Sequence, residues 1–326
     1  MRCLTLACVI CAIGMPASAD LEALRDDHIL PRYAAFAEAT DHLRAAATDD
    51  CLPGSVLPAY HDAYDTWLRI DHVRFGPVEA QDAALSIAFW PDPKDRVGKA
   101  MARLTSARDE AVTDAAAFSQ VSVAAQGFTA LERLLTEPQS DPGYACSFTR
   151  AIARHLAQTA ADVSAEWRDE YGAVLVSAGA VGNAVFPSAE DAERAVYTSI
   201  STALEFLHDQ RLGRPLGTFD RPRPNRAEAR RSERSARHVL LNLRSLRAMT
   251  NAFADVPLER ANTAFDAAIE RAEVLDDPAF AGVSDPAKRL KIEVLQRAVR
   301  DLQVVMAEDV GRVLGISAGF NSLDGD

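Results

Sequence analysis

Hydrophobic residues recur along most of the chain at intervals of three or four positions, which is the period of one face of an α-helix. Proline and glycine separate these periodic stretches from one another. In the first half they cover residues 33–43, 57–70, 118–135 and 152–167, and in the second half roughly 188–212, 226–253, 257–275 and 285–314. No stretch of useful length alternates between polar and apolar positions, so the pattern predicts an all-α fold.

The 326 residues are enough for about two domains. Residues 172–187 are rich in glycine, alanine and valine, and we place the boundary between two domains there. The predicted architecture is two antiparallel helical bundles in tandem, formed by residues 20–180 and 181–326. Aromatic residues make up only 7% of the chain, which suits helices better than sheets.

The first nineteen residues have the features of a secretory signal peptide. Arg2 gives a positive start, Cys3 to Ile13 is apolar, and Ala17-Ser18-Ala19 has the small-x-small pattern of a cleavage site. The sequence therefore predicts an exported protein that is cleaved after Ala19. A buried N-terminal helix and a lipoprotein, the latter suggested by Leu6-Ala7-Cys8, are the alternatives.

Removal of the signal peptide leaves two of the five cysteines, Cys51 and Cys146. An even pair in an exported protein predicts a disulfide bond. The bond would close a loop of 95 positions and stabilise the fold by roughly 4–5 kcal/mol in the chain-entropy model. Two free buried thiols are the alternative. Neither cysteine has a cysteine or histidine two to four positions away, so the spacing matches no zinc site.

The chain is acidic, with 35 lysines and arginines against 47 aspartates and glutamates. Its net charge of −12 becomes −13 when Arg2 leaves with the signal peptide. A protein with this charge is a poor partner for nucleic acid, whose phosphates attract cationic surfaces. No segment of the mature chain is long and apolar enough to predict a transmembrane helix.

A ten-residue motif, Gln126-Gly127-Phe128-Thr129-Ala130-Leu131-Glu132-Arg133-Leu134-Leu135, resembles the signature of the imelysin-like family, which contains Gly-x-His-x-x-Glu. Four further segments are similar to segments of the same family and occur in the same order. They are Trp67 to Phe75-Gly76-Pro77, Phe89-Trp90-Pro91-Asp92, Arg214-Pro215-Leu216-Gly217 with Arg231-Ser232, and the C-terminal Gly319-Phe320-Asn321-Ser322-Leu323-Asp324-Gly325-Asp326.

The resemblance implies a periplasmic, all-helical protein of two bundle-like domains that takes part in bacterial iron uptake. It also implies membrane components of an iron-uptake system as partners, and a functional site near the domain interface. The residues that match the family segments, and that we therefore predict at this site, are Trp67, Trp90, Gly127, Thr129, Glu132, Arg231, Ser232, Asp324 and Asp326.

Thr129 stands where the family has a histidine. Residues three apart lie on one helical face, so a His-x-x-Glu pair presents an imidazole and a carboxylate to one metal ion. A threonine hydroxyl is a poor ligand for a transition metal. Glu132 is then either a structural carboxylate or a ligand of iron or another divalent metal, helped by residues from elsewhere such as Asp324 or Asp326.

Other groups of charged residues are candidate sites. Glu205 and His208 form an isolated Glu-x-x-His pair, whereas a di-iron bundle needs two such pairs, so we interpret it as a solvated face. Seven arginines between Arg221 and Arg237 form either an anion site or a segment that pairs with acidic residues, including Glu228. For Arg231 we predict an ion pair with Glu132 or Asp324. Two acidic and histidine clusters, one of His61, Asp62 and Asp65 and one of Asp71 and His72, we interpret mostly as surface residues.

The sequence thus favours an exported accessory of iron acquisition that binds a ligand, a metal or a membrane partner in the cleft between the domains. A metallopeptidase-like hydrolase is one alternative, although no base, nucleophile or metal pair typical of such an enzyme is present in the sequence. A family member that keeps the fold and has lost its metal site is the other.

Overall fold

The computed structural model describes residues 19–311 and residue 315, and these form an all-α fold. Within that part of the chain no residue belongs to a β-strand, and only two isolated β-bridges occur. The first half contains α1 (Leu21–Ala23), α2 (Leu30–Asp49), α3 (Pro53–Leu68), α4 (Ala83–Ile87), α5 (Arg96–Ala107), α6 (Ala115–Ser119), α7 (Phe128–Thr136), α8 (Pro142–Glu166) and α9 (Gly172–Val176). The second half contains α10 (Ala189–Glu205), α11 (Gly213–Leu216), α12 (Ser235–Phe253), α13 (Glu259–Glu273) and α14 (Pro286–Met306).

Short helices of other types connect or extend these elements. Four are π-helices, namely η1 (Leu24–Ile29), η5 (Trp167–Tyr171), η6 (Phe206–Leu212) and η9 (Ala307–Gly311). Five are 3₁₀ helices, namely η2 (Gly76–Asp82), η3 (Glu110–Thr113), η4 (Val123–Ala125), η7 (Pro224–Arg226) and η8 (Ala281–Ser284).

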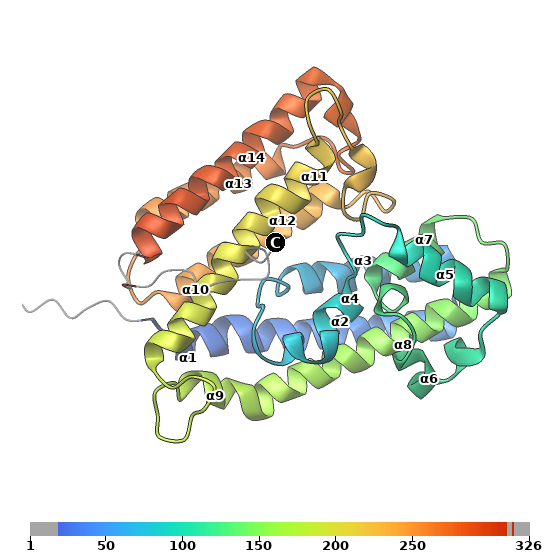
Figure 1. Cartoon of the computed structure of the whole chain (residues 1–326), viewed down its shortest axis with the longest axis horizontal. Helices are drawn as coiled ribbons and strands as arrows, with labels where there is room; N and C mark the ends of the chain where they lie inside the picture. Colours follow the sequence, from blue (N-terminus) through green and yellow to red (C-terminus); the bar gives the residue numbers. More distant parts are fainter. Residues whose placement is uncertain (1–18, 312–314, 316–326) are drawn as a thin grey trace, which may run out of the picture.

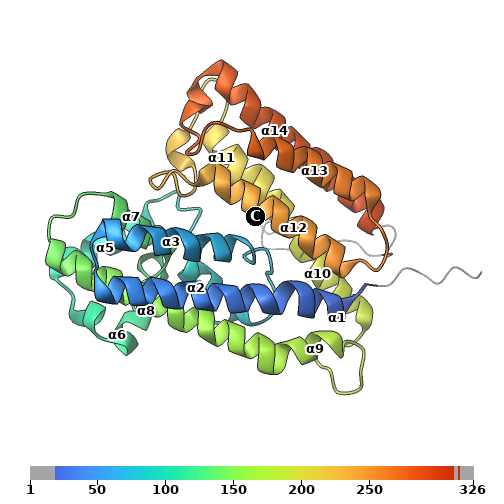
Figure 2. The ribbon, with the colours of Figure 1, turned by 180° about the vertical axis from the view of Figure 1, so that it is seen from behind.

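The helices gather into two groups that lie against each other (Figure 1). In the first, the long helices α2 and α8 run side by side and α3 packs on α2. In the second, α13 packs between α12 and α14, and α10 lies alongside and contacts both α12 and α14 (Figure 2). The buried apolar side chains of both groups belong to one continuous core. The division into separate domains near residue 180 therefore stays a prediction.

Local sequence signals set several helix starts. Asp141 caps α8 by accepting a hydrogen bond from the Tyr144 amide (3.0 Å), and Pro142 follows in the first turn. Ser188 and Asp191 form a reciprocal capping box at α10. Such side chains satisfy backbone amides that have no partner inside the helix. Within residues 19–311, every helix is too short or too polar to cross a lipid bilayer.

The predicted helix over residues 118–135 is wrong, because the chain breaks it into α6, η4 and α7. The Gln126 side chain binds three backbone carbonyls in the break, those of Phe118 (3.1 Å), Ser119 (3.1 Å) and Val121 (3.0 Å). These carbonyls lie at and just after the end of α6, where the helix no longer supplies backbone donors for all of them. Gly127 then starts α7 in an extended conformation.

The helix predicted over residues 226–253 begins nine residues later, at Ser235. Ala229 and Glu233 take positive φ angles of 45° and 57°, which interrupt a right-handed helix. The Arg234 amide bonds back to the Ala229 carbonyl (2.9 Å), and the Ser235 hydroxyl donates to the carbonyl of Glu228. The segment before α12 is therefore a compact turn, and its arginines do not share one helical face.

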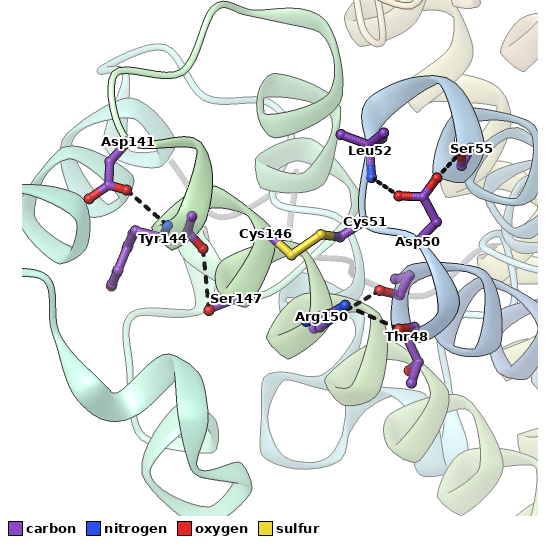
Figure 3. Close-up of a disulfide and its surroundings, with 12 residues drawn as sticks. Thr48, Asp50, Cys51, Leu52, Ser55, Asp141, Tyr144, Cys146, Ser147 and Arg150 are labelled. Carbon is purple, nitrogen blue, oxygen red and sulfur yellow. Dashed lines mark hydrogen bonds between the residues drawn. A yellow bond between two sulfur atoms is a disulfide. The ribbon is translucent and has the colours of Figure 1, made fainter.

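The predicted disulfide between Cys51 and Cys146 is confirmed (Figure 3). It joins the turn before α3 to the N-terminal part of α8, with the two Cα atoms 5.3 Å apart. Next to it, Arg150 donates hydrogen bonds to the carbonyls of Ala47 (3.0 Å) and Thr48 (3.1 Å) at the end of α2. Three helices of the first group are thus tied together at one end.

Replacing both cysteines by serine should lower the free energy of unfolding by about 4–5 kcal/mol, since the unfolded chain loses a crosslink across 95 positions. Urea unfolding followed by circular dichroism measures the loss. A reductant should produce the same loss in the wild type and no change in the double variant. A wild type that unfolds at the same urea concentration with and without reductant would contradict the prediction.

Candidate functional site

A cavity of about 560 Å³ lies where the two groups of helices meet. Its lining comes from two stretches of the chain, residues 67–90 in the first half and residues 191–242 in the second. Both predicted tryptophans, Trp67 and Trp90, contribute to it. The volume is typical of pockets that hold small molecules.

The floor of the cavity contains a buried guanidinium held between two carboxylates. Arg211 donates from Nε to Glu228 Oε2 (2.8 Å) and from Nη2 to Asp71 Oδ2 (2.6 Å). Asp71 follows α3 in the first group, whereas Arg211 and Glu228 belong to the second. The three side chains are 5–11% exposed, so this ion pair joins the two groups away from bulk water.

The three charges shift one another's pKa. Burial by itself would raise the pKa of Glu228, but Arg211 and then His238 outweigh it and hold that pKa at about 2. Burial raises the pKa of Asp71 above its usual range despite the attraction of Arg211. The pKa of Arg211 rises well above its usual value, because the two carboxylates outweigh its burial. Arg211 and Glu228 therefore stay charged at neutral pH.

Asn242 of α12 completes the floor. Its Nδ2 donates to Asp71 Oδ1 (2.6 Å) and to the Leu68 carbonyl (3.2 Å). Because both partners are acceptors, they fix the orientation of the amide. Its Oδ1 is buried and meets no hydrogen-bond donor among the described residues.

The walls are largely aromatic. Trp90 contacts Phe206 edge to face, with ring centroids 5.6 Å apart. Phe206 and Arg211 are five positions apart in the π-helix η6, whose hydrogen bonds span five residues, so both reach the cavity. The Arg211 guanidinium lies 5.1 Å from the centroid of the Phe206 ring.

The motif helix α7 supports the cavity from outside. Phe128 stacks on Tyr64, with ring centroids 4.5 Å apart and planes at 7°. Tyr64 in turn contacts the His238 ring (4.5 Å), and its hydroxyl lies 3.5 Å from Glu228 Oε1. Gly127, Thr129 and Glu132 are not among the lining residues. The family motif thus lies behind the floor of the cavity.

Glu132 is 3% exposed and bridges the two groups of helices. Its Oε1 accepts hydrogen bonds from the backbone amide (2.9 Å) and the hydroxyl (2.7 Å) of Ser232. The structure therefore brings together these two predicted site residues. The Thr129 hydroxyl lies nearby in sequence, is buried, and has no hydrogen-bond partner in the described part of the chain.

Arg231 forms an ion pair with Glu137, just after α7, and not with Glu132. Asp324, the other predicted partner, lies outside the described residues, so that pair stays a prediction. Glu132 bonds the next residue along, Ser232, because the turn before α12 directs the Ser232 amide and hydroxyl toward α7. The acidic partners expected for the arginine-rich segment are found in part. Arg234 and Arg237 both pair with Asp65 of α3, with Arg237 Nε 2.7 Å from Asp65 Oδ2.

The described residues do not fit a metal site. Among them, no group of three or more histidine, cysteine, aspartate or glutamate side chains is placed to hold a metal ion. Glu132 Oε1 accepts a hydrogen bond from the Ser232 hydroxyl. Position 129, three residues before Glu132, carries a threonine hydroxyl where the family has a histidine imidazole. Asp324 and Asp326 lie outside the described residues, so a site that uses them stays a prediction. His208 bonds its neighbour Asp209 (2.5 Å) and is partly exposed.

The sequence interpretation missed the floor of the cavity. The predicted surface position of Asp71 and His72 is wrong, because the Asp71 side chain is 11% exposed and His72 is 2% exposed. They lie just past the end of α3, where helical periodicity no longer indicates which side of the chain is buried. Arg211 was missed because a charged residue near a helix end is usually solvated.

His72 also forms a buried pair with His28 of η1. Their Nε2 atoms lie 2.9 Å apart, so one ring donates a hydrogen to the other and both are neutral. Burial lowers the pKa of both histidines, that of His72 to about 3. A second proton would place two positive rings against each other in the core.

The chain belongs to the Imelysin family, whose model matches residues 29–306. An imelysin-like protein from Psychrobacter arcticum 273-4 has a similar structure, with a TM-score of 0.75 and 18% identity over 92% of this chain and 96% of that one. A protein assigned as an iron-regulated protein A precursor, from Parabacteroides distasonis ATCC 8503, gives a TM-score of 0.72 and 13% identity over 90% and 93%. At these identities the two structures show the fold alone. No curated protein matches the chain.

Gly127 should tolerate no side chain, because a Cβ there would lie 2.2 Å from the carbonyl oxygens of Ser86 and Ile87. We expect Gly127→Ala to lower the free energy of unfolding by about 1–3 kcal/mol, since the backbone of α4 must move. Gly54→Ala is the matched control. No atom lies within 4 Å of its Cβ position, so alanine should be neutral or stabilise α3 by up to ~1 kcal/mol. If Gly127→Ala and Gly54→Ala have the same free energy of unfolding, the backbone at Gly127 does not lie this close to α4.

The paired histidines should make the protein less stable in mild acid. Their pKa values in the folded state lie below the unfolded value of about 6.5, so the unfolded state binds protons more readily. Their stabilisation is complete above pH ~6.5 and is lost as the pH falls toward about 3. The free energy of unfolding should fall by about 1 kcal/mol per pH unit for each histidine.

Chemical denaturation between roughly pH 7 and 5 measures this slope. His28→Gln should reduce the slope by one histidine's share, whereas the exposed His42→Gln should leave it unchanged. A slope in His28→Gln as steep as that of the wild type would show that the pair does not couple folding to pH.

Proposed function

We propose that this protein is a periplasmic accessory of iron acquisition that holds a small-molecule ligand in the cavity between its two groups of helices. The observation that carries the proposal is the cavity itself, about 560 Å³ in volume, with a charged floor and aromatic walls. A buried ion pair that involves Asp71, Arg211 and Glu228 is costly unless it is well hydrogen-bonded. Because this ion pair lies at the cavity floor, we infer that it serves ligand binding as well as stability.

Three further points support the role in iron acquisition. The chain is a member of the Imelysin family, and one protein of similar structure is named for its regulation by iron. The first nineteen residues have the pattern of a signal peptide, which agrees with a periplasmic location. The disulfide agrees with an oxidising compartment. A membrane component of an iron-uptake system is the partner that this role requires.

The alternatives gain less support from the geometry. A metallopeptidase needs a metal and a free carboxylate base, whereas Glu132 accepts two hydrogen bonds from Ser232. Iron or another divalent metal bound at Glu132 would have to displace these bonds or recruit Asp324 and Asp326. A scaffold without a site would not need to keep a cavity with a paired, buried arginine, because apolar residues in its place would be at least as stable.

Deletion of the gene from its bacterium should slow growth when iron is chelated, and the wild-type gene should restore it. Ala195→Trp should fail to restore growth, because Ala195 of α10 lines the cavity and an indole there fills it. Ala189→Trp is the control, since Ala189 is exposed at the start of the same helix. The proposal is wrong if the deletion grows normally on chelated iron, or if Ala195→Trp restores growth as fully as Ala189→Trp.

A further inference from the structure

We propose that the ligand of this cavity is a small organic cation, whose ammonium group binds at the floor while its apolar body lies along the aromatic wall. This inference rests on the proposed function, because it names the ligand class for the same cavity. It depends on three features: an acceptor without a donor, an excess of negative charge at the floor, and aromatic faces above it.

The acceptor is Asn242 Oδ1. Asn242 is fully buried, lines the cavity, and has its amide orientation fixed by Asp71 and the Leu68 carbonyl. A flipped amide would direct its oxygen at two acceptors, which is unfavourable. A buried carbonyl oxygen without a donor costs free energy that a ligand N–H would recover. The floor therefore selects a hydrogen-bond donor.

The charges at the floor favour a cation over a neutral donor. Asp71 and Glu228 carry two negative charges against the single positive charge of Arg211. His238 donates from Nδ1 to Glu228 and does not line the cavity. The whole lining contains four carboxylates, those of Asp71, Glu79, Asp191 and Glu228, and three arginines, Arg74, Arg194 and Arg211. One formal negative charge therefore remains in the lining, which attracts a cation.

An organic cation fits the walls better than an inorganic ion does. A metal ion needs several ligands at once, and no group of three or more metal-binding side chains occurs in residues 19–311. The walls instead offer the rings of Trp90 and Phe75, whose faces attract alkylammonium groups and cover apolar surface. The Phe206 ring beside them already holds the Arg211 guanidinium, 5.1 Å from its centroid.

An anion is disfavoured at the same place. Two of the donor groups of Arg211 are bound to Asp71 and Glu228, and Arg74 at the rim pairs with Glu79 (2.9 Å). A carboxylate ligand would lie against the Asp71 carboxylate and the Asn242 oxygen. Both of these groups are hydrogen-bond acceptors, so neither could donate a hydrogen bond to the ligand. The cavity should therefore discriminate by charge among molecules of one shape.

Isothermal titration of the purified protein with three compounds of similar shape tests this directly. The probes are phenethylamine, phenethyl alcohol and 3-phenylpropionate, which carry a positive, a neutral and a negative end group. We expect phenethylamine to bind at least about tenfold more tightly than the alcohol, as a charged hydrogen bond to a buried acceptor predicts, and the acid not to bind. This comparison uses the unaltered chain, so it does not depend on the folding of any variant.

Asn242→Leu then tests the acceptor. It should weaken phenethylamine by about tenfold and weaken the alcohol less, because a neutral hydroxyl loses a weaker hydrogen bond than an ammonium does. Asn251→Leu is the control, because Asn251 is exposed on the same helix and bonds Asn262 away from the cavity. Thermal melting of both variants separates lost binding from lost folding.

The inference is overturned if the alcohol binds as tightly as the amine, if the acid binds best, or if the amine does not bind. These results can be told apart from failure of the proposed function. If the alcohol or the acid binds and Ala195→Trp abolishes that binding, the cavity still holds a ligand and only its charge is wrong. If no probe binds and Ala195→Trp still fails to restore growth on chelated iron, the role in iron acquisition stands without the organic cation.

Discussion

The contact of Arg211 with Asp71 and Glu228 is the interaction on which the arrangement of the two groups of helices depends. It joins residues 140 positions apart, and it lies where little water can reach. Loss of one partner from such a buried pair typically costs about 3–5 kcal/mol, because the remaining charges are left without compensation. Asn242, Ser199 and Ser232 of the second group also form hydrogen bonds to residues of the first group, namely Asp71, His72 and Glu132. The two groups are therefore held together by hydrogen bonds and ion pairs as well as by apolar packing.

This arrangement gives the family motif a structural meaning in this chain. Gly127 allows α7 to approach α4, Phe128 stacks on Tyr64, and Glu132 binds Ser232 across the boundary. Each of these contacts fixes the position of a residue that stands behind the cavity floor. With threonine at position 129, the motif keeps its role in packing without the ligand pair that a histidine would supply.

The helical period predicted most of the fold because long amphipathic helices such as α2, α3 and α8 bury one regular face. It failed where side chains compete with the helix for backbone bonds, as Gln126 does, and where residues with positive φ, such as Ala229 and Glu233, end it. The cysteine count found the disulfide, since only two cysteines remain once the predicted signal peptide is set aside. Family segments pointed to Trp67, Trp90, Glu132 and Ser232. The floor of the cavity could not be found in this way, because Arg211 reaches it only through the wider turn of a π-helix and Asp71 only through the chain's path after α3.

All the lining of the cavity comes from residues 67–90 and 191–242, and the roughly one hundred residues between them contribute none of it. That intervening stretch carries α5 to α9, Cys146 and the family motif. It therefore braces the cavity from outside without forming part of its lining. Substitutions within it can change stability without changing a lining residue, whereas substitutions in η6 and α12 can change the lining directly. The lining is thus confined to two stretches of the polypeptide, while stabilising contacts come from both the brace and the lining.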